Sequence, residues 1–334
     1  SGGLCAWNAV WFRNDFFRRT YLSSPTFSAM RGGEEPMVLL RKTEPRPIRI
    51  YLTVGTTEPD YFFGNSYYAA CNAAKAFAFA GYDFRFEVFP NEGHCARRSH
   101  PALLRRMMTF LWANYATVPV RPLHRQIRLN QLLPGDSAWT ATDEKLPPRP
   151  ASVTTAAGTY RAEGGHIVFT SASGEKRSVA SAFGDISALA LSSDLWRLYV
   201  ADRARRFVYA MTIQPDGSLA ACYKLAPLHL AHDCRILGAS DLCMGHGDRV
   251  FAATELGIQG IISFGMVDSI MPLPGDRPAD RVVLKGHVLY AASGRQVFKR
   301  TMKIAAPGNG MLPATPSTPG YGDGYEYSIP HLPQ

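Results

Sequence analysis

The 334-residue sequence lacks several features that would assign its class at once. It has no run of 18 uninterrupted apolar residues, so we expect no membrane span. Its six cysteines form no Cys-x-x-Cys pair and no small disulfide framework, which predicts free thiols. The sequence starts with Ser-Gly-Gly and shows no signal peptide, so we expect the natural start to lie upstream. The sequence leaves two localisations open, the cytoplasm on one hand and the periplasm or the exterior of the cell on the other.

The charge distribution lacks a basic block, although the formal net charge is +9. The densest local group is Arg203, Arg205 and Arg206, whereas a nucleic-acid binder concentrates Lys and Arg along one stripe. We therefore expect no nucleic-acid partner. An apolar share of 46% and a charged share of 19% exclude wholesale disorder. The length predicts about two domains.

Residues 1–117 alternate short apolar runs with longer helix-like stretches. Strands are expected at 19–23, 49–54 and 84–89, and helices at 4–12, 66–80 and 101–112. This order is typical of an α/β fold with a parallel sheet and helices on its faces. In such sheets the loops that leave the carboxyl ends of the strands build the site.

The pattern changes after residue 117. Residues 118–158 hold six prolines and are expected to form a linker. Residues 159–306 show short β-rich runs and predict an all-β domain, and the Gly- and Pro-rich tail 307–334 is expected to be irregular. Three similar segments begin at Arg197, Arg249 and His287, a spacing typical of propeller blades. The length of this part predicts about three blades, hence a partial β-propeller.

Candidate catalytic residues follow the order of an α/β-hydrolase. Ser1-Gly2-Gly3 precedes the first helix, as in the second half of a nucleophile elbow. Glu58 and Asp60 follow the second expected strand, and His94 follows the third. A hydrolase of this fold places its acid and its histidine after later strands in that order.

Residues 1–115 resemble the C-terminal half of the enterochelin-type esterases, which are α/β-hydrolases. The matching stretches are Ser1-Gly-Gly-Leu-Cys-Ala-Trp-Asn-Ala, Arg31-Gly-Gly, Leu40-Arg-Lys-Thr-Glu44, Pro47-Ile-Arg-Ile-Tyr-Leu, Gly64-Asn65, Ala80-Gly-Tyr-Asp-Phe-Arg-Phe86 and Gly93-His94. The family pattern G-x-S-x-G-G implies that Ser1 fills the slot after the nucleophile. The attacking serine would then lie upstream of residue 1, and the backbone N–H of Ser1 would serve the oxyanion hole.

This resemblance implies His94 as the general base and Glu58 as its acid, with a small-molecule ester as substrate. Asp60 remains an alternative acid, because the family residue is usually Asp and Glu is longer. Ser1 itself remains an alternative nucleophile, read as S-x-G through Gly3. His100 is expected to open the last helix rather than to catalyse.

Residues 160–306 resemble part of the gluconolactonase/regucalcin (SGL) family of six-bladed, cation-binding propellers. The matching stretches are Ala188-Leu-Ala-Leu-Ser-Ser-Asp194, Leu198-Tyr-Val-Ala-Asp202, Ile213-Gln-Pro-Asp-Gly-Ser-Leu219, Gly238-Ala-Ser-Asp-Leu-Cys243 and Glu255-Leu-Gly-Ile-Gln259. Two ligand slots implied by the family hold Ser187 and Ser240, which supply no charge to a hard cation. We therefore expect no metal and no other cofactor. Should calcium bind, Asp185, Asp202 and Asp241 are the first carboxylates to consider.

One rival metal site is His229-x-x-His232-Asp-Cys234, whose spacing offers zinc ligands but no fourth ligand. Loop residues are the simpler interpretation of this segment.

The sequence thus predicts a fragment of a serine carboxylic-ester hydrolase joined to a degenerate lactonase-like propeller, inactive as given. The alternatives are a non-catalytic binding or scaffolding protein and a metal-dependent lactone hydrolase.

Overall fold

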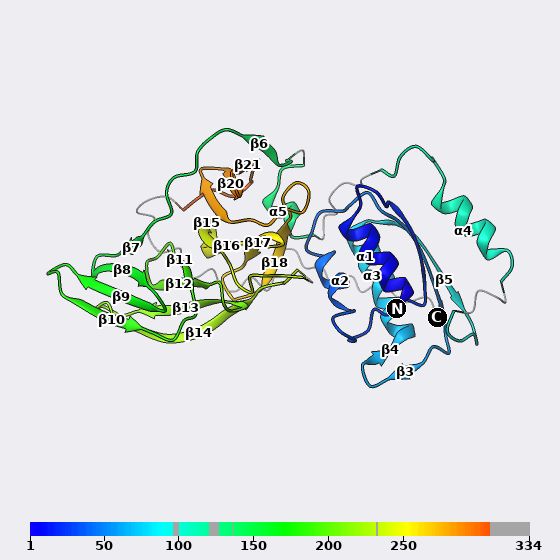
Figure 1. The fold of residues 1–334 in the computed structure, drawn as a ribbon, viewed down its shortest axis with the longest axis horizontal. Coiled ribbons are helices and arrows are strands. Elements are labelled where there is room, and N and C mark those ends of the chain that lie inside the picture. The colour runs from blue at the N-terminus through cyan, green and yellow to red at the C-terminus, as the bar shows by residue number, and fades with distance from the viewer. Residues whose placement is uncertain (96–99, 120–126, 136, 232, 308–334) are drawn as a thin grey trace.

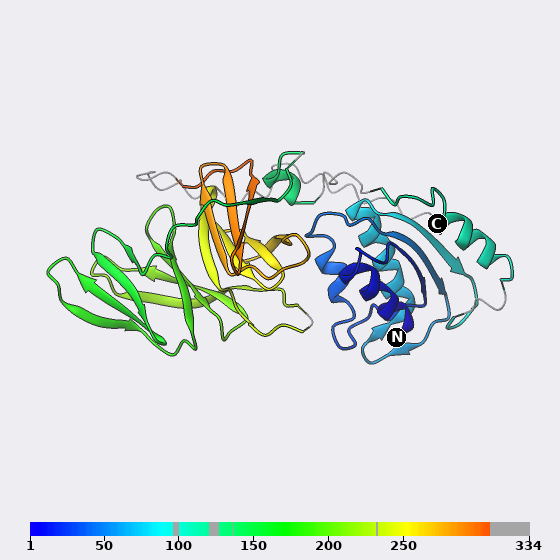
Figure 2. The same ribbon diagram turned by 45° about the horizontal axis from the view of Figure 1, so that its top comes forward.

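The computed structural model describes residues 1–95, 100–119, 127–135, 137–231 and 233–307. Figures 1 and 2 show two units side by side along the longest axis, one of helices on a small sheet and one of successive small sheets. The elements of the first unit are α1 (Gly2–Phe12), β1 (Arg19–Ser23), α2 (Glu35–Leu39), β2 (Arg49–Gly55), β3 (Asp60–Tyr61), β4 (Gly64–Asn65), α3 (Ser66–Ala80), β5 (Asp83–Phe89) and α4 (Leu103–Leu111).

The first unit contains a small parallel sheet in the order β1-β2-β5. The central strand β2 is buried along its whole length, as expected for a strand covered on both faces. Its alternate side chains enter different cores: Ile50 packs with α1 and α3 through Trp7 and Phe77, whereas Tyr51 packs with Leu103 of α4. The parallel α/β arrangement expected from the sequence is therefore present.

The second unit continues with α5 (Leu129–Leu132) and four-stranded antiparallel sheets. Its strands are β6 (Thr140–Thr142), β7 (Ser152–Thr154), β8 (Gly158–Glu163), β9 (His166–Ser171), β10 (Lys176–Ala180), β11 (Ile186–Leu191), β12 (Arg197–Asp202), β13 (Phe207–Ile213), β14 (Leu219–Pro227), β15 (Asp241–Gly245), β16 (Arg249–Thr254), β17 (Gly257–Ile261), β18 (Val267–Met271), β19 (Arg281–Lys285), β20 (Val288–Ser293) and β21 (Gln296–Thr301), with a 3₁₀ turn at His246–Asp248. The sheet orders are β10-β9-β8-β7, β11-β12-β13-β14, β15-β16-β17-β18 and β19-β20-β21-β6.

These sheets have the form of propeller blades. The similar segments of the sequence become β12, β16 and β20, each the second strand of its sheet. The first strands contact one another in chain order, β7 with β11, β11 with β15 and β15 with β19. Within the described part of the chain β7 does not pack comparably on β19, so the blades form an arc.

The structure differs from the sequence-based expectation in two respects. The described residues form four blade-like sheets where about three blades were expected, and the expected linker 118–158 takes part in two of them. Its strand β6 pairs with β21, and its strand β7 pairs with β8. Both strands are only three residues long, and the partner of β6 lies far away in the sequence. No local sequence pattern therefore marks either strand. The tail from residue 308 lies outside the described residues.

The first unit covers the outer edge of the third blade. The N–H of Ile270 in β18 donates to the carbonyl of Lys42 over 2.8 Å, and every residue of β18 is buried. An edge strand left open is prone to pair with other chains, and here it is covered. Two bidentate ion pairs flank this contact: Arg300 with Glu44 at 2.6 Å, and Arg46 with Asp276 at 2.7 Å.

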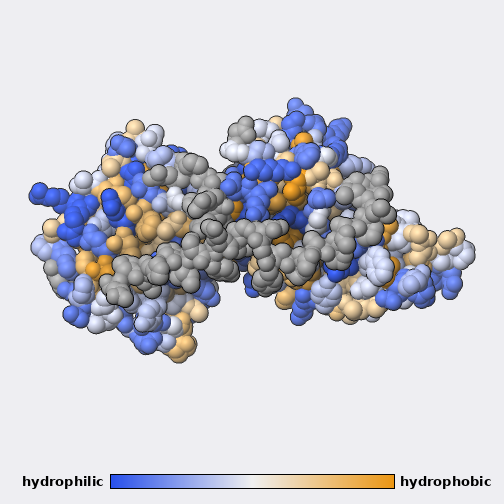
Figure 3. Space-filling view, turned by 180° about the vertical axis from the view of Figure 1, so that it is seen from behind, coloured by the Kyte–Doolittle hydropathy of each residue, from blue (hydrophilic) through white to orange (hydrophobic). Residues whose placement is uncertain are grey.

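The outer surface is mixed in character. Figure 3 shows hydrophilic and hydrophobic residues interspersed over both units, with a narrowing between them. All six cysteines are free, and Cys5 and Cys222 are exposed. No helix among the described residues is long and apolar enough to cross a membrane.

Candidate functional site

Two loops at one edge of the parallel sheet carry the expected catalytic residues. Glu58 follows β2 and His94 follows β5, and neighbouring parallel strands end at the same edge. The loops lie close together because Gly55 has no side chain: a Cβ there would stand 2.1 Å from the carbonyl oxygen of Glu92. The N–H of Thr57 also donates to that carbonyl over 3.0 Å.

The acid and the histidine are in contact. His94 Nδ1 lies 2.7 Å from Glu58 Oε2. The Glu58 side chain is fully buried, whereas 52% of the His94 side chain is exposed. None of the hydrogen bonds among the described residues involves His94 Nε2. The orientation is the one in which a carboxylate holds an imidazole for proton transfer at Nε2.

Ser24 completes this arrangement and was not singled out in the sequence. Its hydroxyl donates to Glu58 Oε1 and accepts from the N–H of Cys95 over 3.1 Å. It therefore links the loop after β1 to the acid and to the residue that follows His94. The serine pair at the end of the first expected strand was the only sequence signal for it. Ser24 thus contacts the carboxylate of Glu58 rather than the imidazole of His94.

The other candidate residues of this half lie apart from the Glu58–His94 contact. Asp60 is exposed in the short hairpin of β3 and β4. His100 stacks on Phe89 with ring centroids 3.9 Å apart, and its Nε2 lies 3.7 Å from Glu92. The acid beside the histidine is therefore Glu58 and not Asp60.

Ser1 lies at the start of α1, against the loop that follows β1. Its α-amino group donates to Thr26 Oγ1 over 3.1 Å. Two residues on, a Cβ at Gly3 would stand 2.8 Å from the α-carbon of Pro25. The first turn of α1 thus approaches the loop that also carries Ser24. The oxyanion role of Ser1 stays a prediction.

The expected cation slots of the propeller contain a different set of contacts. Ser187 is buried and its hydroxyl donates to the carbonyl of Ala239 over 2.6 Å. Asp202 accepts from the N–H groups of Gly184, Asp185 and Ala204. Asp241 binds Arg281, with Nε 2.8 Å from Oδ2.

Ser240 is also buried, and its N–H donates to the carbonyl of Ala253 over 2.8 Å. Asp185 is exposed, 3.8 Å from Arg203. Over the described ranges, no group of three or more His, Cys, Asp and Glu side chains is placed to hold a metal ion. These residues do not fit a calcium site.

The rival zinc motif lies at the contact between the two units. His229 Nδ1 lies 2.6 Å from Glu35 and its Nε2 lies 2.8 Å from Lys42 Nζ. The hydrogen bond from His229 Nδ1 holds the pKa of Glu35 below its usual value, and burial lowers the pKa of Lys42. Both ring nitrogens of His229 are therefore engaged, and His232 lies outside the described residues.

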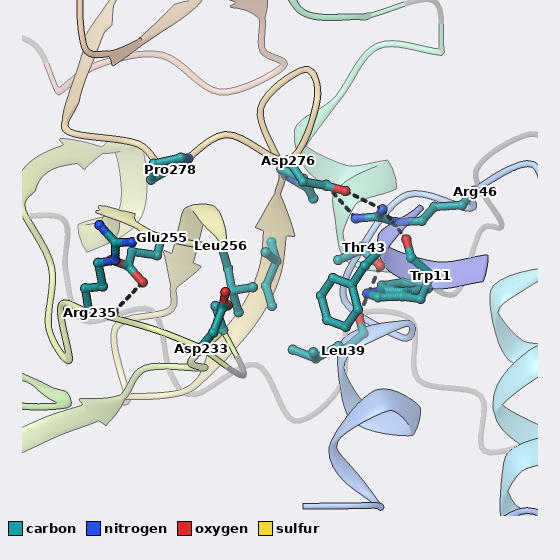
Figure 4. A pocket seen from close by; sticks show the side chains of 14 residues that line it. Trp11, Leu39, Thr43, Arg46, Asp233, Arg235, Glu255, Leu256, Asp276 and Pro278 are labelled. Carbon is teal, nitrogen blue, oxygen red and sulfur yellow. Dashed lines mark hydrogen bonds and ion pairs between the residues drawn. The ribbon is translucent and has the colours of Figure 1, made fainter. Parts of the chain in front are cut away.

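A cavity of about 340 Å³ also lies between the units (Figure 4). Trp11 and Leu39 approach it from the first unit, and Leu256 and Ile270 from the second. Arg46 bridges it, bound to Asp276 and to the carbonyl of Trp11. Neither Glu58 nor His94 lines this cavity.

Comparisons with known proteins match no family model and no curated protein. Solved structures similar to this chain include a gluconolactonase from Xanthomonas campestris, at 17% identity and a TM-score of 0.36 over 41% of this chain and 44% of that one. A calcium-binding regucalcin from Agrobacterium tumefaciens shares 11% identity, with a TM-score of 0.38 over 46% and 60% of the two chains. A luciferin-regenerating enzyme shares 16% identity, with a TM-score of 0.36 over 53% and 61%.

The similarity to gluconolactonase- and regucalcin-like propellers extends over about half of this chain, and the chain spans 44% to 61% of the length of these proteins. The resemblance of residues 1–115 to enterochelin-type esterases stays a prediction.

Proposed function

We propose that the first unit supplies the acid and the histidine of a serine esterase that cleaves carboxylic esters by acyl transfer. The observation that supports this most directly is the 2.7 Å contact between His94 Nδ1 and the fully buried carboxylate of Glu58. A purely structural histidine would not require a buried carboxylate that is held by the hydroxyl of Ser24 while half of the histidine side chain is exposed. The nucleophilic serine is proposed to precede Ser1, in the register of the G-x-S-x-G-G pattern.

In this proposal His94 Nε2 takes the proton of the serine hydroxyl as its oxygen attacks the ester carbonyl. The imidazolium that forms is stabilised by Glu58, whose other oxygen is held by Ser24. His94 then gives the proton to the leaving alkoxide, and the acyl group remains on the serine. A water molecule, deprotonated by the same nitrogen, releases the acid and regenerates the serine.

The test uses two proteins, residues 1–334 and a longer protein that continues the upstream reading frame through an encoded G-x-S. The longer protein should hydrolyse p-nitrophenyl acetate, and Glu58→Gln should reduce kcat by about a thousandfold or more, because the histidine loses its orienting charge. His94→Ala should abolish the rate. Residues 1–334 alone should show no turnover above their own His94→Ala control.

The matched controls are Asp60→Asn, which removes the rival acid, and His166→Ala, which removes an exposed histidine of β9. Both should retain full activity. A low-field Nδ1–H proton resonance that disappears in Glu58→Gln would report the contact independently of turnover. Turnover that survives His94→Ala would overturn the proposal. Turnover of residues 1–334 that is lost in Ser1→Ala would assign the nucleophile to Ser1.

A further inference from the structure

Three arginines gather at the end of the arc that carries Ser240, one of the two ligand slots implied by the family resemblance. Arg281 begins β19 beside Asp241, which begins β15. Arg149 precedes β7 and also pairs with Asp241, and Arg203 directly follows β12. The first strands β7, β11, β15 and β19 line the inner side of the arc, so these groups meet at one end of its axis.

One arginine already satisfies the buried carboxylate. Asp241 accepts from Arg281 Nε at 2.8 Å and from the N–H groups of Leu242 and Val282 at 3.1 and 3.2 Å. Arg281 is further fixed by the carbonyl of Pro147 at 3.0 Å. The neutralisation of Asp241 therefore does not require Arg149.

The remaining arginines carry buried donors that the described residues do not satisfy. Arg149 Nε stands 3.3 Å from Asp241 Oδ1 as an ion pair, but it makes no aligned hydrogen bond. Arg203 Nε is likewise buried and without a hydrogen-bond partner among the described residues. A buried donor left unpaired is costly, so such groups normally meet a ligand or a water molecule. The Nε atoms themselves are covered, but the side chains are 30% and 38% exposed, so other parts of both arginines are accessible from solvent.

The electrostatics of this cluster favour an anion. Burial lowers the pKa of Arg149, and the charges of Arg281 and Arg203 lower it further, against the opposing effect of Asp241. The arginines are opposed by Asp241 and by Asp185, which lies 3.8 Å from Arg203. The carboxylates of Asp241 and Asp185 offset part of this charge, and Asp202, the residue before Arg203, is paired with Arg205 at 3.5 Å.

We propose that the guanidinium groups of Arg149 and Arg203 bind a small monocarboxylate at this end of the arc. A carboxylate offers oxygens on a planar group, which matches the planar array of donors on a guanidinium. Positive side chains thus occupy the position where carboxylates would hold a metal ion, and we expect the site to prefer an anion to a cation.

The experiment titrates residues 1–334 with sodium trifluoroacetate and follows the ¹⁹F resonance. Saturable binding with a Kd of about 1–10 mM is expected for a few charge-assisted hydrogen bonds at a partly exposed site. Arg149→Gln and Arg203→Gln should each weaken binding at least about fivefold. Arg161→Gln, which removes the same charge from an exposed position of β8, should leave the Kd unchanged.

The urea midpoint of each variant reports whether it folds, and two independent arginine variants keep the test valid if one does not. Equal weakening in Arg149→Gln and Arg161→Gln would overturn the site, because only the overall charge would then matter. The absence of saturation would also overturn it. Tighter binding of inorganic phosphate would overturn the monocarboxylate assignment. A stoichiometric micromolar calcium site would overturn the preference for an anion over a cation.

Discussion

At the residue scale, buried charge is paired inside individual blades. Arg249 and Asp268 form a bidentate pair, with contacts of 2.6 and 3.0 Å, across the third blade. The Asp268 side chain is only 3% exposed, and Ser269 donates a further hydrogen bond to it. A carboxylate buried to this extent depends on its guanidinium partner.

Arg249→Met should lower the free energy of unfolding by about 3–5 kcal/mol, because it leaves the charge of Asp268 buried and unpaired. Urea unfolding measures the loss. Arg161→Met, at an exposed position, is the matched control and should change the midpoint little. The double variant Arg249→Met with Asp268→Asn should recover part of the loss, and strict additivity of the two changes would contradict this account.

At the element scale, the sequence predicted the elements whose signals are local. The helix at 66–80 has its expected bounds, because Asn65 accepts from the N–H groups of Tyr67 and Tyr68 and Gly81 ends the helix at a φ of 75°. By contrast, β6 depends on pairing with a distant strand and has no local signal. Ser24 was missed for a related reason, because its role depends on three loops that meet only in the fold.

Asn65→Ala should lower the stability of the first unit by about 1 kcal/mol, because two N–H groups of the first turn of α3 lose their acceptor. Asn72→Ala, on the exposed side of the same helix, is the control. It should be neutral or slightly stabilising, since alanine is the better helix former. Differential scanning calorimetry distinguishes them, and an equal effect of both substitutions would exclude capping as the cause.

At the scale of the whole molecule, a polar network joins the two units. Glu35 and Lys42 of the first unit both contact His229 of the second. The side chain of Gln259 accepts a hydrogen bond from the backbone N–H of His229 and donates one to the backbone carbonyl of His229. The orientation of the units is therefore coupled to the ionisation of groups at their contact.

The stabilisation by Glu35 should depend on pH, because its contact with His229 holds its pKa below the ordinary value of 4.5. A depressed carboxyl pKa gives stability that is complete above the unfolded value and is lost as the pH falls through the folded value. Glu35→Gln should therefore cost about 1 kcal/mol near neutral pH and progressively less below about pH 4.5. Denaturant midpoints across this range, with Glu34→Gln as control, measure the difference. A difference that is constant with pH would count against this role of the Glu35 carboxylate.

The pairing of β6 with β21 also sets an order of events in time. Thr140 donates a hydrogen bond to the carbonyl of Lys299, 159 positions away in the sequence. Glu144 stabilises the same pairing by accepting hydrogen bonds from Lys299 and Tyr290. During synthesis β6 emerges long before its partner exists, so the last blade is completed only when nearly all of the propeller has left the ribosome. The first three sheets draw all their strands from nearby chain and form earlier. The nascent protein therefore carries an unpaired strand whose partner is the last strand of the arc to be made.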